Sequence, residues 1–140
     1  MIKPAVYDDL KKIYAIEMEV YDTPWSYESF VKEFYNPCSQ IYVYEYNKSI
    51  IGFVVIWDLG NEVEIANIAV SKSYQGQGVG GKLLEFVLDS KGDAVFYLEV
   101  EEGNKAARRL YTKFGFIEYG KRLNYYGLGK HAILMKLKKG

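Results

Sequence analysis

Hydrophobic positions recur with two different periods along this chain of 140 residues, and the period switches repeatedly. Apolar residues three or four apart predict four helices, over about 9–21, 26–36, 79–91 and 104–114. Alternating or continuous runs of Val, Ile and Tyr predict strands over about 40–46, 49–59, 62–70, 94–100, 116–126 and 131–138, with one more strand before the first helix. The order β-α-α-β-β-β-α-β-α-β-β predicts an α/β fold, of the α+β kind, with a mixed central sheet of six or seven strands.

Residues suited to helix ends and turns stand at the expected boundaries. Ser26 and Asn104 have side-chain oxygens that can cap the helices that follow them. Gly92 and Gly115 stand where the end of a helix favours glycine. Asn47-Lys48 separates two apolar runs and predicts a hairpin. These local signals agree with the periodicity.

Composition narrows the classes of function. Hydrophobic residues make up 49% of the chain, which can therefore bury a core, and the length fits a single domain over 1–140. Eighteen basic residues balance eighteen acidic ones, which argues against direct nucleic-acid binding because that needs clustered positive charge. The lone cysteine, Cys38, suits a reducing compartment, and no leader or membrane-spanning segment is evident. We expect a cytoplasmic protein without a membrane partner, as a monomer or a weak homodimer.

A glycine-rich segment, Gln75-Gly76-Gln77-Gly78-Val79-Gly80-Gly81, follows a predicted strand and opens a predicted helix. Free backbone N–H groups and the helix dipole favour an anion there, and glycine lets a phosphate approach closely. Read as G-x-G-x-x-G, the segment would bind a dinucleotide, but that motif belongs after the first strand of a two-part fold. Read as the P-loop pattern G-x-x-x-x-G-K, it has Leu83 where Ser or Thr should hold Mg²⁺.

The same segment also contains the pattern Q-x-x-G-x-G, and further motifs follow it in order. They are Leu98-Glu99-Val100, Asn104, Leu110-Tyr111 and Phe114-Gly115-Phe116, with Pro24-Trp25-Ser26 nearer the start and Arg122, Asn124, Tyr125 and Tyr126 nearer the end. Together these motifs resemble the GNAT superfamily of acetyl-CoA-dependent N-acetyltransferases, in its RimI-type branch. The resemblance spans most of the chain and implies the GNAT fold, with about four helices flanking the sheet, as one N-acetyltransferase domain.

The resemblance implies a site that uses acetyl-CoA as cosubstrate, releases CoA and needs no metal. Backbone groups of Ile68, Ala69 and Val70 would pair with the pantetheine arm like an added strand. The pyrophosphate would lie on Gln75, Gly76, Gln77, Gly78, Val79, Gly80 and Gly81, and Asn104 and Tyr111 would complete the coenzyme site.

Two side chains are expected to carry the chemistry. Glu99 stands in an otherwise apolar strand and would remove a proton from the amine. Tyr111, seven residues after Asn104 on one helix face, would protonate the departing thiolate. Glu64, on the preceding strand, is a rival base. The structural alternatives are a Glu99 that only pairs with a lysine and a Tyr111 that only fills the core.

The RimI-type branch acts on protein N-termini, so the implied acceptor is the α-amino group of a protein, such as a ribosomal protein. Rigid aromatic side chains suit a peptide groove, and the candidates are Trp25, Tyr27, Tyr125 and Tyr126. The alternatives are acetylation of a small amine or a lysine side chain, and an acyl-CoA-binding module without turnover.

Two positions depart from the branch's pattern. Glu101 stands where these enzymes usually have Arg after L-E-V, and Lys130-His131 stands where they usually have an acidic pair. We hypothesise that the two changes are linked, as a charge pair of reversed polarity between Glu101 and the Lys130-His131 pair.

Overall fold

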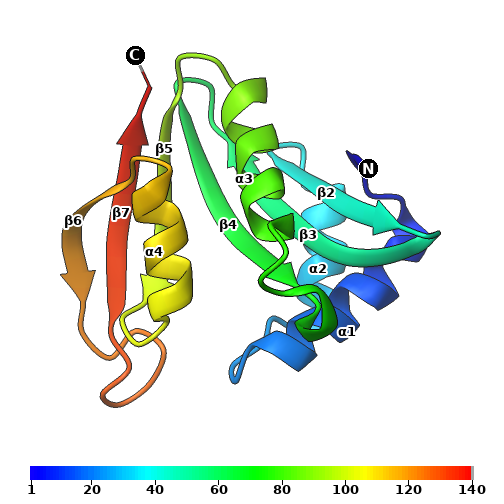
Figure 1. Cartoon of the computed structure of the whole chain (residues 1–140), viewed down its shortest axis with the longest axis horizontal. Coiled ribbons are helices and arrows are strands. Elements are labelled where there is room, and N and C mark those ends of the chain that lie inside the picture. The colour runs from blue at the N-terminus through cyan, green and yellow to red at the C-terminus, as the bar shows by residue number, and fades with distance from the viewer. Residues whose placement is uncertain (140) are drawn as a thin grey trace.

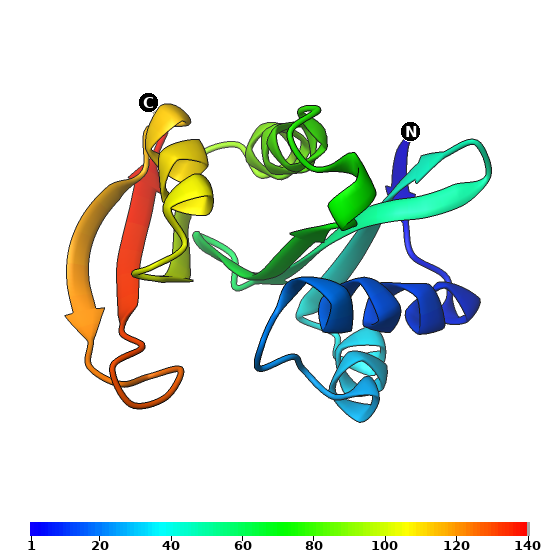
Figure 2. The ribbon, with the colours of Figure 1, turned by 60° about the horizontal axis from the view of Figure 1, so that its bottom comes forward.

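A computed structural model, which describes residues 1–139, shows one twisted sheet with helices on both faces (Figures 1 and 2). The strands are β1 (Ile2–Pro4), β2 (Ser39–Tyr46), β3 (Ser49–Asp58), β4 (Glu62–Val70), β5 (Val95–Glu101), β6 (Ile117–Arg122) and β7 (Ala132–Lys138). The helices are α1 (Leu10–Val20), α2 (Tyr27–Tyr35), α3 (Val79–Ser90) and α4 (Lys105–Lys113). The sheet order is β1-β2-β3-β4-β5-β7-β6, with β4 and β5 parallel and the other neighbours antiparallel. The predicted α/β architecture with a mixed sheet is confirmed.

The predicted helix caps and hairpin are also confirmed. The Ser26 hydroxyl accepts the Ser29 N–H at 3.1 Å, and Asn104 Oδ1 accepts the Ala107 N–H at 3.2 Å. The two residues between β2 and β3 have positive φ angles of 50° and 64°, the left-handed pair that a tight two-residue hairpin requires. These boundaries depend on local chemistry, which explains why the sequence predicts them.

Two hydrophobic clusters cover the two faces of the sheet. Helices α1 and α2 bury Leu10, Ile13 and Phe30 against one face of the sheet. On the other face, α3 and α4 cover a cluster that includes Leu83 of α3 and Phe96 of β5. Figure 2 shows α3 and α4 above the sheet and α1 and α2 below it. None of the helices within residues 1–139 is long and apolar enough to cross a membrane.

The parallel strands β4 and β5 diverge part way along their length. Their last paired residues are Ile65 and Leu98, although β4 continues to Val70 and β5 to Glu101. An extra residue in β4, Ala66, interrupts the pairing with β3 at the same point, as a β-bulge does. The two strands move apart toward the bottom of Figure 1. The divergence leaves β4 with an unpaired edge inside the sheet.

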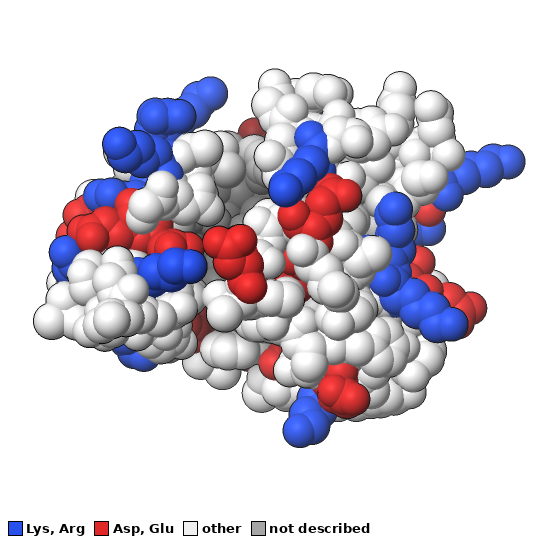
Figure 3. Space-filling model, turned by 90° about the horizontal axis from the view of Figure 1, so that it is seen from below, with Lys and Arg blue, Asp and Glu red and all other residues white. Residues whose placement is uncertain are grey.

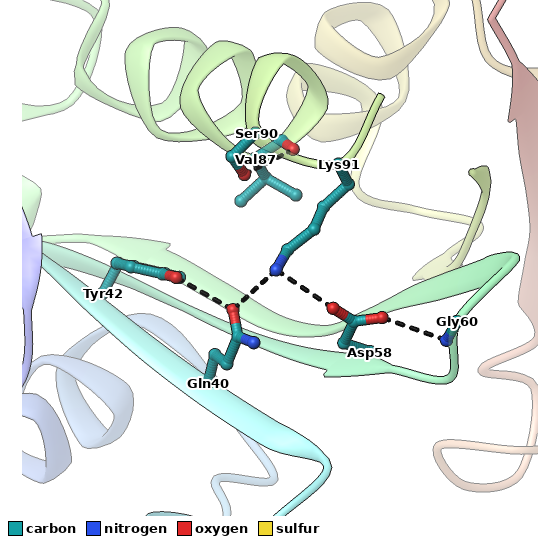
Figure 4. Close-up of polar contacts among 7 residues, drawn as sticks. All are labelled: Gln40, Tyr42, Asp58, Gly60, Val87, Ser90 and Lys91. Atoms are coloured by element: carbon teal, nitrogen blue, oxygen red, sulfur yellow. Dashed lines mark hydrogen bonds and ion pairs between the residues drawn. The ribbon is translucent and has the colours of Figure 1, made fainter. Parts of the chain in front are cut away.

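Lys91 ties the end of α3 to the β2–β3 hairpin (Figure 4). Its Nζ lies 2.9 Å from Gln40 Oε1 and 3.1 Å from Asp58 Oδ2, and its side chain is 16% exposed. Asp58 also accepts the Gly60 N–H at 3.0 Å, and the Tyr42 hydroxyl donates to Gln40. The helix that begins at the glycine-rich segment is therefore held to the sheet at its other end.

We expect Asp58→Asn to lower the melting temperature at neutral pH by about 3 °C, because a partly exposed ion pair contributes about 1 kcal/mol. The Gly60 N–H and then Lys91 hold the pKa of Asp58 below its usual range. The stabilisation is therefore present above the unfolded-state pKa of about 4 and is lost as the pH falls through the lower folded-state value. Melting curves of both proteins at pH 7 and pH 3 measure this, and the difference between the two proteins should be smaller at pH 3 than at pH 7.

Asp89→Asn is the matched control for this ion pair. Asp89 lies 4.0 Å from Lys139 and its side chain is 74% exposed. Its replacement should leave the melting temperature at pH 7 unchanged within about 1 °C. An Asp58→Asn protein that melts like wild type at pH 7 would contradict the stabilising role of the Lys91 contact.

Candidate active site

A cavity of about 880 Å³ occupies the gap between the diverging strands. Its walls come from β4, β5, the end of α1, the loop after α1, α4 and the segment between β6 and β7. The predicted site residues that line it are Trp25, Ile68, Gln75, Glu99, Asn104, Tyr111, Tyr125 and Tyr126. Tyr27 is not among the lining residues, and its ring packs 5.9 Å from that of Tyr14. Segments distant in the sequence thus meet around one space.

The gap joins the two faces of the sheet. Along β5, Phe96, Leu98 and Val100 are buried in the cluster under α3 and α4. Because side chains alternate along a strand, Glu99 points to the opposite face, the side of α1 and α2. Tyr111 comes from α4 and is buried in that same cluster under α3 and α4. The two predicted catalytic residues therefore approach the cavity from opposite sides, and two reactants could meet between them.

The backbone of β4 presents hydrogen-bonding groups to the gap. The Ser71 N–H donates to Ile51 O in β3 at 2.8 Å. Because orientation alternates along a strand, the groups of Ala69 also face β3, and those of Ile68 and Val70 face the gap. An extended molecule with amide groups could therefore add to this edge as a strand would.

Two carbonyl groups on this edge already have side-chain partners. The Tyr21 hydroxyl donates to Ile68 O, and Gln75 Nε2 donates to Val70 O at 3.0 Å. No strand within residues 1–139 pairs with the N–H groups of Ile68 and Val70. The edge therefore offers free donors, and its carbonyl oxygens keep a second lone pair for another donor.

The start of α3 offers a second set of free donors. Its first backbone bond runs from the Lys82 N–H to Gly78 O at 3.0 Å, so the N–H groups of residues 79–81 have no helical acceptor. Gly76 and Gly78 have positive φ angles of 79° and 86°, and an added Cβ at either would meet nothing within 4 Å. The loop exposes bare backbone at a helix N-terminus, which suits a phosphate group.

Carboxylates and a guanidinium lie together on the α1–α2 side of the gap. Glu99 Oε1 lies 3.5 Å from Arg122 Nη1, and the guanidinium lies 5.4 Å from the centre of the Tyr125 ring. Burial and then the nearby Glu99 charge raise the pKa of Glu64. Burial and then Glu99 raise the pKa of Tyr126 to about 12. The ion-pair partner of Glu99 is thus an arginine, and Glu64 lines the same cavity as Glu99.

Tyr111 belongs to the core and to the cavity wall together. It is 6% exposed, and its ring lies 5.9 Å from that of Phe116. Burial raises the pKa of its hydroxyl well above the usual range. The phenol therefore stays protonated at any physiological pH and can donate a proton.

The cavity wall is strongly acidic. Its carboxylates are Glu17, Asp22, Glu64, Glu99 and Glu101, and Arg122 is the one Lys or Arg residue among the lining residues. Viewed from below, acidic side chains gather over the left and centre of the molecule, with basic ones among and around them (Figure 3). A protonated amine would be attracted to such a cavity.

The hypothesis of a linked charge pair at Glu101 is wrong. Lys130 Nζ instead lies 3.8 Å from Asp22 in the loop after α1. His131 Nδ1 accepts the Asn124 N–H at 2.9 Å. Glu101 forms no ion pair within the described residues 1–139. The β6–β7 loop folds back on itself and toward α1, which adjacent strand positions could not reveal.

Sequence analysis missed a buried carboxylate in the cavity wall. Glu17 is 2% exposed, and its carboxylate accepts the Trp25 N–H and the Asn67 Nδ2–H, each at 3.0 Å. Burial raises the pKa of Glu17. The available signal was an acid on the apolar face of α1 and an Asn inside the apolar run of β4. This contact holds the loop after α1 against the bulged part of β4.

We expect Asn67→Asp to destabilise the protein by about 3 kcal/mol at pH 8, because it would place a second carboxylate beside buried Glu17. The like charge would raise the pKa of the pair further, so a proton would be taken up as the pH falls. Stability should therefore recover toward pH 5, and urea unfolding at pH 5 and pH 8 measures this recovery. Asn67→Leu is the control, since it loses the hydrogen bonds without adding charge. An equal loss at both pH values for Asn67→Asp would contradict the argument.

Comparison with known proteins places this geometry in a family. Residues 6–116 match the acetyltransferase (GNAT) family. A relative from Haemophilus influenzae, named [ribosomal protein bS18]-alanine N-acetyltransferase, is 38% identical over 91% of this chain and 90% of its own length. The Escherichia coli protein of the same name is 35% identical over 92% of this chain and 90% of its own length.

Solved structures agree with the sequence relatives. The crystal structure of the Escherichia coli ribosomal-protein-S18-alanine N-acetyltransferase superposes with a TM-score of 0.91, at 32% identity, and covers 99% of this chain and 92% of that one. Arabidopsis thaliana Naa50, solved in complex with the bisubstrate analogue CoA-Ac-MVNAL, shares the fold with a TM-score of 0.82 at 19% identity, over 99% of this chain and 98% of that one.

Proposed function

Because this chain belongs to the GNAT family of acetyltransferases, we propose that it transfers the acetyl group of acetyl-CoA to the N-terminal α-amino group of a protein. The chain is an N-acetyltransferase, and the proposal concerns which amine accepts the acetyl group. One observation carries the proposal: the gap in the sheet has a free β4 edge for a donor and an acidic cavity for a protonated amine. Two relatives are named for ribosomal protein bS18, so the N-terminus of that protein is the first acceptor to test.

The free backbone groups of the site fit the coenzyme. Ile68 and Val70 would bind the pantetheine arm through the groups that face the gap, and Ala69 between them keeps β4 paired with β3. The backbone of Gly76–Gly81 and the N-terminus of α3 would hold the pyrophosphate, with Gln75, Gln77 and Val79 shaping the loop. Asn104 caps α4 beside this channel. Acetyl-CoA supplies the acyl group as a thioester.

The chain's own residues would move two protons. Glu99, on the acceptor side, would take a proton from the ammonium group of the acceptor. Tyr111, on the donor side, would give a proton to the departing sulfur, and its raised pKa keeps it in the protonated form that this requires. Both reactants would meet in the gap, so direct transfer needs no covalent enzyme intermediate. Glu64 is the alternative acceptor of the first proton.

A protein N-terminus suits this chemistry better than a lysine side chain. An α-amino group has a pKa near 8, whereas deprotonating a lysine at the same pH costs about 3–4 kcal/mol more. The acceptor side is lined by Trp25, Tyr125 and Tyr126, which would contact the first residues of a peptide. Tyr27 lies outside the cavity lining, at the start of the helix that follows Trp25. A small polyamine is the second candidate, because the acidic wall would also attract it.

A panel of acceptors tests the proposal by release of free CoA thiol and by mass spectrometry of the product. The panel contains the N-terminal peptide of bS18, the same peptide with its α-amine blocked, peptides with other first residues, and spermidine. We expect release with free N-termini and none with the blocked peptide. Release with spermidine alone would assign a small-amine enzyme, and CoA binding without release would indicate a module without turnover.

A further inference from the structure

We propose that Tyr21 closes the inner end of the donor channel and restricts the transferred acyl group to acetyl. The inference rests on the proposed function and concerns the donor rather than the acceptor. Tyr21 follows α1 directly, lines the cavity and belongs to no motif that sequence analysis identified. It is therefore a specificity-determining residue that only the tertiary structure reveals.

The position of the Tyr21 hydroxyl on the β4 edge supports this role. An added Cβ at Gly80 would stand 3.7 Å from the Val70 side chain, so the Val70 end of the edge adjoins the glycine-rich loop. Ile68 lies two residues deeper in the gap, and Tyr21 donates its hydroxyl hydrogen to Ile68 O. A donor that runs along this edge from the loop therefore reaches Tyr21 at its inner end.

Tyr21 lines the same cavity as Tyr111, the proposed proton donor. Burial and then the phenol of Tyr111 raise the pKa of Tyr21, and the Glu17 carboxylate adds to the shift. Since Tyr111 would protonate the sulfur, the acyl carbon bound to that sulfur would lie in the space between the two phenols. An acyl chain longer than acetyl would have to displace the Tyr21 ring.

The surroundings of Tyr21 resist such a displacement. Its N–H donates to Glu17 O at 3.0 Å at the end of α1. The Glu17 carboxylate holds Trp25 on one side and Asn67 of β4 on the other. The backbone before and after Tyr21 is thus tied to the helix and the sheet. A fixed ring of this size discriminates by volume, and a single methylene group in a closed pocket changes kcat/KM by about 10- to 200-fold.

The test compares acetyl-, propionyl- and butyryl-CoA in wild type and in the graded variants Tyr21→Phe, Tyr21→Leu and Tyr21→Ala. We expect the ratio of kcat/KM for butyryl-CoA to that for acetyl-CoA to rise at least ten-fold in Tyr21→Ala and less in Tyr21→Leu. Tyr21→Phe keeps the ring and should hold the ratio within about three-fold of wild type. Calorimetric Kd values measured without acceptor should follow the same order, with butyryl-CoA gaining affinity relative to acetyl-CoA as the side chain shrinks.

The controls separate this inference from the proposed function. Tyr125→Ala, on the other wall, should leave the donor ratio unchanged. A folded Tyr21→Ala with the wild-type donor ratio, or with altered preference only for the first residue of the peptide, would overturn the inference and leave the proposed function intact. A wild type that uses acetyl-CoA and butyryl-CoA equally would overturn it as well. If no amine releases CoA, the proposed function fails, and the Kd series alone then decides the role of Tyr21.

Discussion

Replacing Glu99 by Gln is expected to lower kcat by about 10²- to 10⁴-fold with a peptide acceptor at pH 7, the range that a general base contributes. Gln keeps the shape of the side chain but cannot accept the proton. Glu99 faces the α1–α2 side, away from the β4 edge, so the Kd for acetyl-CoA should stay within about two-fold of wild type. Steady-state kinetics with thiol detection and calorimetry measure the two quantities.

The pH dependence sharpens this test. An acceptor α-amine has a pKa near 8, so it loses its proton without help at higher pH. The deficit of Glu99→Gln should therefore shrink as the pH rises from 7 to 9.5 if Glu99 removes that proton. A lysine acceptor, with a pKa near 10.4, would still be mostly protonated at pH 9.5, so its deficit should still be growing smaller at that pH rather than levelling off near pH 8.

Glu64→Gln is the matched control for Glu99→Gln. Both carboxylates line the cavity, and each is replaced by its isosteric amide. We expect Glu64→Gln to lower kcat less than ten-fold, because in the proposed mechanism Glu99 takes the proton and Glu64 only adds negative charge to the cavity wall. A larger loss for Glu64→Gln than for Glu99→Gln would transfer the role of base to Glu64.

Replacing Tyr111 by Phe is expected to lower kcat by about 10²-fold, because the sulfur would then leave without a proton donor. Phe keeps the packing against Phe116, so the melting temperature should change by less than about 2 °C. Burial raises the pKa of the Tyr111 hydroxyl far above that of a free tyrosine. Wild-type kcat should therefore not fall between pH 8 and pH 10 through loss of this proton, and a pH profile measures it.

Tyr126→Phe is the comparison for Tyr111→Phe. Tyr126 also lines the cavity, but it comes from the β6–β7 segment on the other side. Its replacement should change kcat less than five-fold and act mainly on the KM of the peptide. Equal losses of kcat in the two variants would contradict a specific role for Tyr111 in protonation.

The contrast between β6 and the other strands shows where local patterns stop being sufficient. The apolar pattern predicts a strand to about residue 126, but β6 ends at Arg122. The Asn124 N–H bonds to His131 Nδ1, and Asn124 Oδ1 accepts the Gly129 N–H at 2.8 Å. These contacts form a compact loop that brings Tyr125 and Tyr126 to the cavity, and periodicity alone does not distinguish it from a continuing strand.

The amino-acid sequence by itself determined the helices, most of the strands, the caps and the glycine-rich loop, because each depends on neighbours within a few residues. Its motifs also named Glu99 and Tyr111 as a pair. Only the tertiary structure decided that these two residues line one cavity in the gap between β4 and β5, that Glu17 holds the loop after α1, and that Tyr21 reaches Ile68. These contacts depend on how the bulged strand β4 diverges from β5 and on which side chains are buried at that point. Both follow from packing between segments about fifty residues apart in the sequence, which local patterns do not describe.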